Sequence, residues 1–136
     1  MLSSDAAVLL ERGDTAEVTH VRRLVSCGQQ PAIAGVWHAA GVLVDGMLPE
    51  QSAMRLVRVY APKALSASAL HLVTAPSPLD AHVLFSSVAA LLGGAGQANY
   101  SAANACLDAL GVQERTDGRA AVSVQWGAWA QVGMAA

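Results

Sequence analysis

The sequence is short of charge, of aromatic side chains and of cysteine, and each shortage removes a class of function. Only 13% of its 136 residues are charged, and the formal net charge is −2, so no basic surface that would bind nucleic acid is indicated. The two cysteines, Cys27 and Cys106, are far apart and lack the spacing of metal ligands. We interpret them as small buried residues in a reducing compartment, and we expect no metal site.

Long hydrophobic runs are also missing. No run approaches the roughly 20 residues that span a bilayer, and no basic region precedes the short apolar run near the start of the chain, so we expect neither a membrane partner nor a signal peptide. These features favour the cytoplasm and leave a plastid open. What the chain has is apolar residues, 54% of the total, enough to bury the core of one domain.

Apolar runs alternate with helix-like patterns along the whole chain. We expect strands at 6–10, 32–38, 82–86 and 120–126, helices at 15–26, about 50–74 and about 97–114, turns at 46–49 and 117–118, and an irregular tail at 127–136. Pro62 lies inside the long helix and should kink or interrupt it. The order β-α-β-α-β-α-β, with strands apolar on both faces, predicts an α/β fold: a doubly wound, Rossmann-like parallel sheet.

The stretch 82–108 has the features of a site. A strand ends on Ser86 and Ser87, a glycine-rich loop follows, and Tyr100 and Asn104 then lie four residues apart on one helical face. Ligands of such sheets collect outside the carboxyl ends of the strands. Taken singly, the serines are also typical of turns, and the tyrosine is typical of a packing residue with its hydroxyl in water.

Six segments carry a resemblance to a known family. They are HAAG (38–41), LVDG (43–46), APKA (61–64), LFSSVA (84–89), GQANYSAAN (96–104) and VQWGAWAQVGMA (124–135). With them the sequence resembles the ketoreductase domain of modular polyketide synthases and animal-type fatty acid synthases, within the short-chain dehydrogenase/reductase superfamily. The resemblance covers nearly the whole chain, so we expect residues 1–136 to form one partial ketoreductase domain.

The resemblance implies four catalytic residues. The family serine lies thirteen residues before the tyrosine, which selects Ser87, with Tyr100 as the tyrosine. Most of the superfamily has a lysine four residues after the tyrosine; in these ketoreductases an asparagine stands there and the lysine comes from the preceding long helix. Asn104 and Lys63 match that exchange. By itself Lys63 would be interpreted as a solvated surface charge, as most lysines are.

The implied reaction is the NADPH-dependent reduction of a 3-ketoacyl thioester. Hydride reaches the keto carbon while Tyr100 protonates the oxygen and Ser87 donates a hydrogen bond to it. Lys63 supplies a cation beside the tyrosine and orients the cofactor ribose, and Asn104 holds the lysine or a relay water. The implied partners are an acyl carrier protein, which presents the substrate on phosphopantetheine, and the other domains of a synthase.

The resemblance also implies residues that contact the cofactor and residues that control stereochemistry. The cofactor set is Asp14, His38, Ala39, Ala40, Gly41, Trp126 and Gly127. Asp14 is equally consistent with a helix cap, Gly41 with a simple turn, and Trp126 and Trp129 with core packing. The stereocontrol set is Asp45, which keeps the last Asp of a family Leu-Asp-Asp motif, Leu92, which replaces the Trp of the opposite class, and Gln97. Together they favour the D-3-hydroxy product.

The family's glycine-rich dinucleotide fingerprint is missing from the sequence. The pattern corresponds to a fold whose first β-α-β-α is absent, and with it the pyrophosphate site. We therefore expect the strand near 33–38 to expose an edge and the strand at 6–10 to have no partner in its normal place. Two hypotheses follow: the catalytic part of a reductase, or a non-catalytic fragment that acts as a structural or interaction piece.

Overall fold

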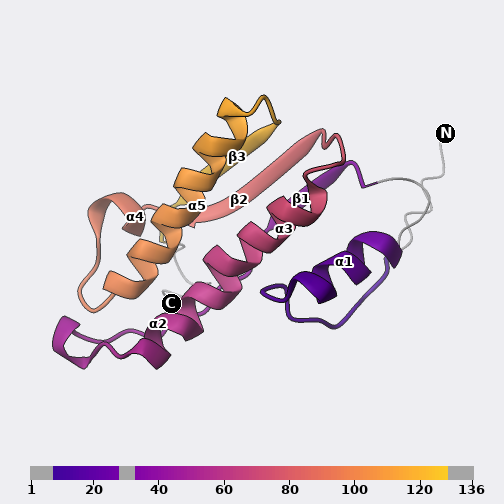
Figure 1. Ribbon diagram of the computed structural model, residues 1–136. Helices are drawn as coiled ribbons and strands as arrows, with labels where there is room; N and C mark the ends of the chain where they lie inside the picture. Colours follow the sequence, from indigo (N-terminus) through magenta and orange to yellow (C-terminus); the bar gives the residue numbers. More distant parts are fainter. Residues whose placement is uncertain (1–7, 28–32, 129–136) are drawn as a thin grey trace.

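The computed structural model describes residues 8–27 and 33–128 and contains one parallel sheet. Its strands are β1 (Gly35–His38), β2 (Ala81–Ser87) and β3 (Ala121–Trp126), in the order β1-β2-β3. Both pairings are parallel, with Leu84 beside His38 on one side and beside Ser123 on the other. Each connection crosses through helices, which lie in front of the sheet in Figure 1. The predicted α/β, Rossmann-like parallel fold is confirmed, as an incomplete one.

Seven helical segments precede and connect these strands in the described part of the chain. They are α1 (Val18–Cys27) before β1, then η1 (Leu48–Glu50), α2 (Ala53–Tyr60), η2 (Ala61–Leu65) and α3 (Ser66–Thr74) before β2, and α4 (Ala89–Leu92) and α5 (Ala98–Thr116) before β3. The expected helix at 50–74 runs without a break from 53 to 74, because Pro62 is accommodated in a π-helical turn, η2, instead of ending the helix. Ser52 starts it by accepting a hydrogen bond from the Arg55 amide at 3.3 Å.

One face of the sheet packs against the helices. Alternate residues of β2 are buried there: His82, Leu84 and Ser86. Leu84 forms a cluster with Ala67 of α3 and Leu107 of α5. This side therefore holds the central core, and it fixes α5 over β2 and β3, as Figure 1 shows.

The other face of the sheet is apolar and much more exposed. The intervening residues of β2, Val83 and Phe85, lie in register with large apolar residues of the neighbouring strands. Trp37 is 63% exposed and Val122 44%. Phe85 stacks on Trp126 with ring centroids 5.7 Å apart. Strands of a doubly wound sheet are normally covered by helices on both faces. In the described part of this chain, helices cover one face of the sheet, and the face that carries Trp37 and Val122 is exposed.

Several expectations about the elements were wrong. Residues 8–10 of the expected first strand are not in a strand, and Leu10 is 89% exposed; residues 6 and 7 lie outside the described part. A single extended segment without a neighbouring strand leaves its backbone groups unpaired, which explains the loss. The strand expected at 32–38 begins only at Gly35, and β1 forms the sheet edge, with β2 as its one partner among the described strands, as predicted.

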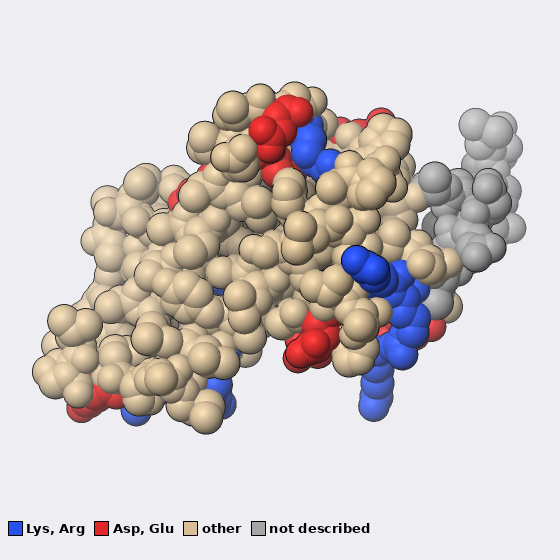
Figure 2. All heavy atoms as spheres, viewed as in Figure 1, with Lys and Arg blue, Asp and Glu red and all other residues tan. Residues whose placement is uncertain are grey.

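The surface corrects the prediction that both cysteines are buried. Cys106 is exposed on α5, not buried, because the buried face of that helix is defined by Tyr100, Ala103 and Leu107. The side chain of Cys27 and the tail from 129 onward, including Trp129, lie outside the described part. No helix within 8–27 and 33–128 is both long and apolar enough to cross a membrane. Charged side chains are sparse on the face shown in Figure 2 and lie mainly toward its margins.

Candidate functional site

The two serines at the end of β2 have different surroundings. Ser86 faces the helices, is 4% exposed, and donates from Oγ to the Asn104 carbonyl at 3.3 Å. Ser87 has the opposite strand orientation, is half-buried, and its Oγ accepts a hydrogen bond from the Ala89 amide at 3.2 Å. Ser86 therefore ties the strand to α5, while the Ser87 hydroxyl hydrogen remains available for a ligand.

Tyr100 and Asn104 occupy the buried face of α5, as their spacing predicts. Tyr100 is 8% exposed and packs with Val59 and Ala103. The Asn104 side chain is fully buried and donates from Nδ2 to the Tyr100 carbonyl at 2.9 Å. Its Oδ1 is buried with no hydrogen-bond partner among the described residues. A buried acceptor of this kind is costly unless a donor reaches it.

Lys63 is buried, so the alternative of a solvated surface lysine is wrong. It is 3% exposed, its Nζ donates to the Phe85 carbonyl at 3.1 Å, and Nζ lies 5.3 Å from the centroid of the Tyr100 ring. Burial lowers the pKa of Lys63 from 10.5 to about 8, against a smaller opposing effect from the Asp108 carboxylate. Lys63 is therefore mostly protonated at neutral pH, and its ammonium lies beside the tyrosine ring.

The HAAG segment at the end of β1 meets this lysine. A Cβ added at Gly41 would lie 2.9 Å from Lys63 Cε, so glycine permits the close approach. His38 is 4% exposed, and its Nε2 lies 3.1 Å from the Pro62 carbonyl and 2.9 Å from Ser66 Oγ. Burial is the main cause that lowers the pKa of His38 to about 4, so its ring is neutral. The imidazole thus contacts protein on this side and does not face an open site.

Two of the stereocontrol residues come together across loops that are distant in sequence. Gln97 donates from Nε2 to the Asp45 carboxylate at 3.2 Å. The Gly46 amide donates to the Gly96 carbonyl at 2.9 Å, which holds the two loops side by side. Asn99, a residue that our sequence analysis missed, is 1% exposed and donates to the Val44 carbonyl at 2.9 Å. Its position next to the tyrosine was the only available signal.

The remaining predicted residues are not joined to this cluster by the contacts described above. Asp14 accepts a hydrogen bond from the Ala16 amide at 2.9 Å in a turn that leads into α1. Ala39 and Gly127 are exposed, Ala40 is half-buried, and Leu92 is 83% exposed on α4. Trp126 is 40% exposed and stacks on Phe85, so it is not a core residue in this structure.

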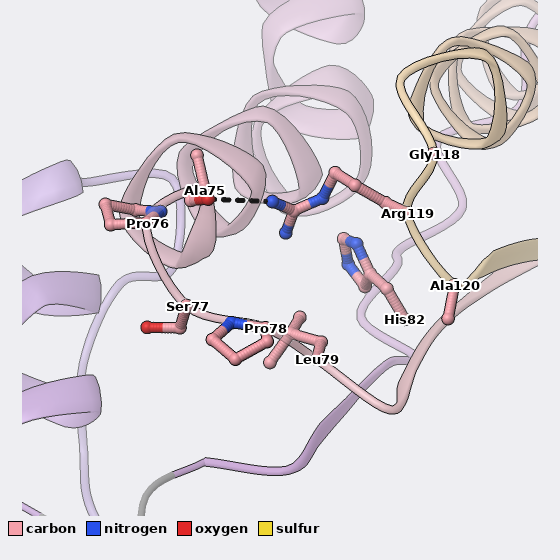
Figure 3. A pocket seen from close by; sticks show the side chains of 9 residues that line it. All are labelled: Ala75, Pro76, Ser77, Pro78, Leu79, His82, Gly118, Arg119 and Ala120. Carbon is pink, nitrogen blue, oxygen red and sulfur yellow. Dashed lines mark hydrogen bonds between the residues drawn. The ribbon is translucent and has the colours of Figure 1, made fainter.

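A pocket of about 430 Å³ lies at the opposite end of the sheet. Figure 3 shows its lining residues, which precede β2 and β3 or begin β2, with His82 and Arg119 on one side and Pro76 and Pro78 on the other. Behind it, the buried Glu114 carboxylate accepts hydrogen bonds from His82 Nδ1 at 2.8 Å and His71 Nδ1 at 2.7 Å. Because catalytic groups of parallel sheets lie at the carboxyl ends, this pocket is separate from the site.

The cluster at the carboxyl ends offers a hydroxyl, a phenol, an ammonium and an amide. These groups can donate hydrogen bonds and a proton to an oxygen that gains negative charge. Lys63 has three N–H donors, of which one is directed to the Phe85 carbonyl. Within the described residues, no group of three or more His, Cys, Asp or Glu side chains could hold a metal ion. The arrangement suits proton transfer to a bound carbonyl.

Comparison with known proteins agrees with this arrangement. A family model described as the KR domain matches residues 1–131. The chain is 54% identical over 101 residues to polyketide synthase GfsA of Streptomyces halstedii, a match that covers 74% of this chain and 1% of that synthase.

Solved structures give the same result. A ketoreductase from the first module of phoslactomycin biosynthesis in Streptomyces sp. HK803 has a TM-score of 0.83 and 40% identity, over 90% of this chain and 28% of that one. An A-type ketoreductase from a modular polyketide synthase has a TM-score of 0.87 and 39% identity, over 92% and 27%. The chain thus spans about a quarter of these structures, and it belongs to the ketoreductase (KR) domain family of polyketide synthases.

Proposed function

We propose that this chain is the catalytic part of an NADPH-dependent ketoreductase in a polyketide or fatty acid synthase. The complete unit reduces a 3-ketoacyl thioester, presented on the phosphopantetheine arm of an acyl carrier protein, to the 3-hydroxyacyl thioester. The observation that carries the proposal is the buried Lys63 ammonium, 5.3 Å from the Tyr100 ring. Its Nζ donates to the Phe85 carbonyl of β2, the strand that ends in Ser87. A buried cation beside a phenol is expensive and has no evident structural purpose.

The residues fit the nicotinamide end of the cofactor. Lys63 retains N–H donors beyond the one given to Phe85, the Gly41 turn lies against its side chain, and the unpaired Asn104 Oδ1 can accept a hydrogen bond from the lysine or a relay water. When bound, NADPH would supply the hydride that reduces the keto carbon. The glycine-rich phosphate site would have to come from the rest of the reductase unit.

Side chains of this chain then protonate the ketone oxygen and stabilise its developing charge. Tyr100 gives its phenolic proton to that oxygen as the carbon is reduced, which forms the O–H bond of the product and leaves a phenolate. Ser87 donates a hydrogen bond to the same oxygen and lowers the cost of its developing charge. The Lys63 ammonium stabilises the phenolate, and a proton from solvent restores Tyr100 by way of Lys63 and Asn104.

We also propose the D-3-hydroxy product. The proposal is supported by the hydrogen bond between Asp45 and Gln97, which holds the Asp45 loop at the entrance of α5, and by the exposed Leu92 where the opposite class has Trp. Chiral chromatography of the product from a diketide thioester tests it. Predominance of the L-3-hydroxy isomer would reject this assignment and leave the reductase assignment intact.

A second function is favoured by one observation, the exposed apolar face that carries Trp37 and Val122. A piece with such a face could serve as a non-catalytic unit that another polypeptide covers. An antibody against residues 117–136 distinguishes the two functions by the size of the native polypeptide. A band of several hundred kilodaltons supports a synthase subunit, and a band near the 13.9 kDa of this chain supports the second function.

The catalytic proposal is tested on the full polypeptide that carries this sequence. Oxidation of NADPH is followed with a 3-ketoacyl thioester, and Tyr100→Phe is compared with the unaltered protein. We expect the variant to lose at least ~100-fold in kcat, since the general acid is removed. Cys106→Ser, an exposed change on the same helix, is the control and should keep full activity. Equal turnover by the Tyr100 variant would reject the proposal.

A further inference from the structure

We propose that His38 is a positioning residue for Lys63: its Nε2–H bond to the Pro62 carbonyl holds the π-helical turn that presents the lysine. The inference deepens the proposed function and rests on it. His38 was expected to contact the cofactor as part of the HAAG turn. Its imidazole instead lies against the helix that carries the lysine, 3.1 Å from the Pro62 carbonyl.

The π-helical turn leaves the Pro62 carbonyl without its ordinary partner. In an α-helix that carbonyl would accept a hydrogen bond from the amide of Ser66, four residues on. Here the Ser66 amide donates to the carbonyls of Ala61 and Lys63. His38 supplies the missing donor from another element of the fold, and a carbonyl oxygen can only accept, so Nε2 carries the hydrogen. The same nitrogen approaches Ser66 Oγ at 2.9 Å, and that hydroxyl passes its own hydrogen to Thr15 Oγ1 at 2.7 Å.

The HAAG segment therefore holds the turn at two points. His38 contacts Pro62, and three residues later Gly41 packs against Lys63 Cε. Between these contacts lies the backbone of Lys63, whose Nζ reaches the Phe85 carbonyl. If the turn relaxed to an α-helix, the Ser66 amide would return to Pro62, and the direction of the Lys63 side chain would change. The His38 bond opposes that relaxation, because the Pro62 carbonyl would have to turn away from its Nε2 donor to meet the Ser66 amide.

The direct test follows the position of Lys63 and does not depend on catalysis. The 13Cε signal of Lys63 is titrated with pH in the 136-residue chain. Burial places the pKa of Lys63 at about 8, so we expect the midpoint there. In His38→Leu, which removes the donor and keeps an apolar side chain, we expect the midpoint to rise by at least one pH unit. His38→Gln places an amide donor close to the Nε2 position and should restore the midpoint to about 8.

A matched control separates positioning from general loss of stability. His71→Leu is the same substitution at a histidine of α3, and it removes a hydrogen bond to Glu114. We expect it to lower the melting temperature while the Lys63 midpoint stays at about 8. If His38→Leu does not fold, His38→Asn replaces it, since its amide ends one bond short of the Nε2 position. A Lys63 midpoint that stays at about 8 in whichever of these two variants is folded would overturn the proposal, since neither can make the bond to the Pro62 carbonyl.

The kinetic test uses the full polypeptide. Displacement of a catalytic group by about 1 Å costs ~100-fold in rate, so His38→Leu should lower kcat by about that factor, leave the KM of the thioester unchanged, and be rescued by His38→Gln. Wild-type protein that reduces no thioester would reject the proposed function, while the lysine titration would still decide the role of His38. A shifted lysine midpoint without loss of kcat in an active enzyme would overturn the positioning role in catalysis.

Discussion

Replacing Lys63 by methionine should stabilise the fold while it removes activity. Burial lowers the pKa of this lysine from 10.5 to about 8, and each pH unit is worth about 1.4 kcal/mol, so the charged side chain costs the native state at most about 3 kcal/mol. Methionine of similar length avoids this cost but gives up the hydrogen bond to the Phe85 carbonyl, worth about 1 kcal/mol. The net gain at pH 7 is therefore about 2 kcal/mol.

The pH dependence gives the sharper form of this prediction. The native chain releases the Lys63 proton near pH 8, whereas the unfolded chain keeps it up to pH 10.5. Between these values the unfolded state binds more protons, so the free energy of unfolding of the wild type rises with pH. The advantage of Lys63→Met should shrink across this window and reverse above it. Lys63→Arg, whose side chain stays charged, should be less stable than the wild type and should lack this rise.

Urea and thermal unfolding followed by circular dichroism, at several pH values from 7 to 11, measure the free energy of unfolding and the melting temperature of all three proteins. At pH 7 the melting temperature of Lys63→Met should lie roughly 5–10 °C above that of the wild type. The reasoning is refuted if Lys63→Met is less stable at pH 7, or if its difference from the wild type does not change with pH. Either result would mean that the ammonium is solvated in solution.

Three further changes test other parts of the site. Gly41→Ala places a methyl group 2.9 Å from Lys63 Cε, so the lysine must move; we expect at least a ~10-fold fall in kcat of the full reductase, and an unchanged kcat would contradict the packing. Ser86→Ala should lose its hydrogen bond to α5 and about 1 kcal/mol of stability. Ser87→Ala should lose turnover and change stability by less than about 0.5 kcal/mol. Urea unfolding and NADPH oxidation are measured for both variants, and loss of turnover in Ser86→Ala instead of Ser87→Ala would contradict these roles. Glu114→Ala removes the carboxylate partner of the buried His82 and the partly exposed His71 and should cost about 3 kcal/mol of stability. We expect kcat to be unaffected, because this cluster lies at the opposite end of the sheet; a lower kcat in folded protein would contradict that separation.

The sequence predicted the strands that are paired and failed where pairing is missing. The runs that became β2 and β3 were located to within about one residue, because their apolar patterns agree with their burial between neighbours. The expected strand at 6–10 had the same kind of pattern, yet residues 8–10 have no strand beside them. Apolar composition records the environment for which a segment is suited, and it does not show whether the neighbour is present.

Part of the candidate site could be predicted from the sequence, and the contacts that support it could not. Helix geometry was enough to place Tyr100 and Asn104 on one face of α5, whereas the choice of Ser87 over Ser86 came from the family resemblance and stays a prediction. The sequence does not show that Lys63 is buried, that a π-helical turn carries it, or that His38, 24 residues from Pro62 along the chain, lies 3.1 Å from the carbonyl of that turn. No periodicity in a single sequence reports a side chain that completes the hydrogen bonding of a distant helix.

The π-helical turn η2 sets the rotation of α2 relative to α3 in the continuous helix at 53–74. A π turn adds one residue relative to the α-helical repeat, so the side chains of α2 and α3 are out of phase by about 100°. Deletion of one residue within 57–65 would return the helix to a single phase and rotate the outward face of α2 relative to the sheet. The loop at 75–80 should accept insertions more readily, since most of it lies at the surface. Within residues 53–74, an inserted or deleted residue rotates one part of the helix relative to the other. The fold should therefore tolerate substitutions in this helix far better than insertions or deletions.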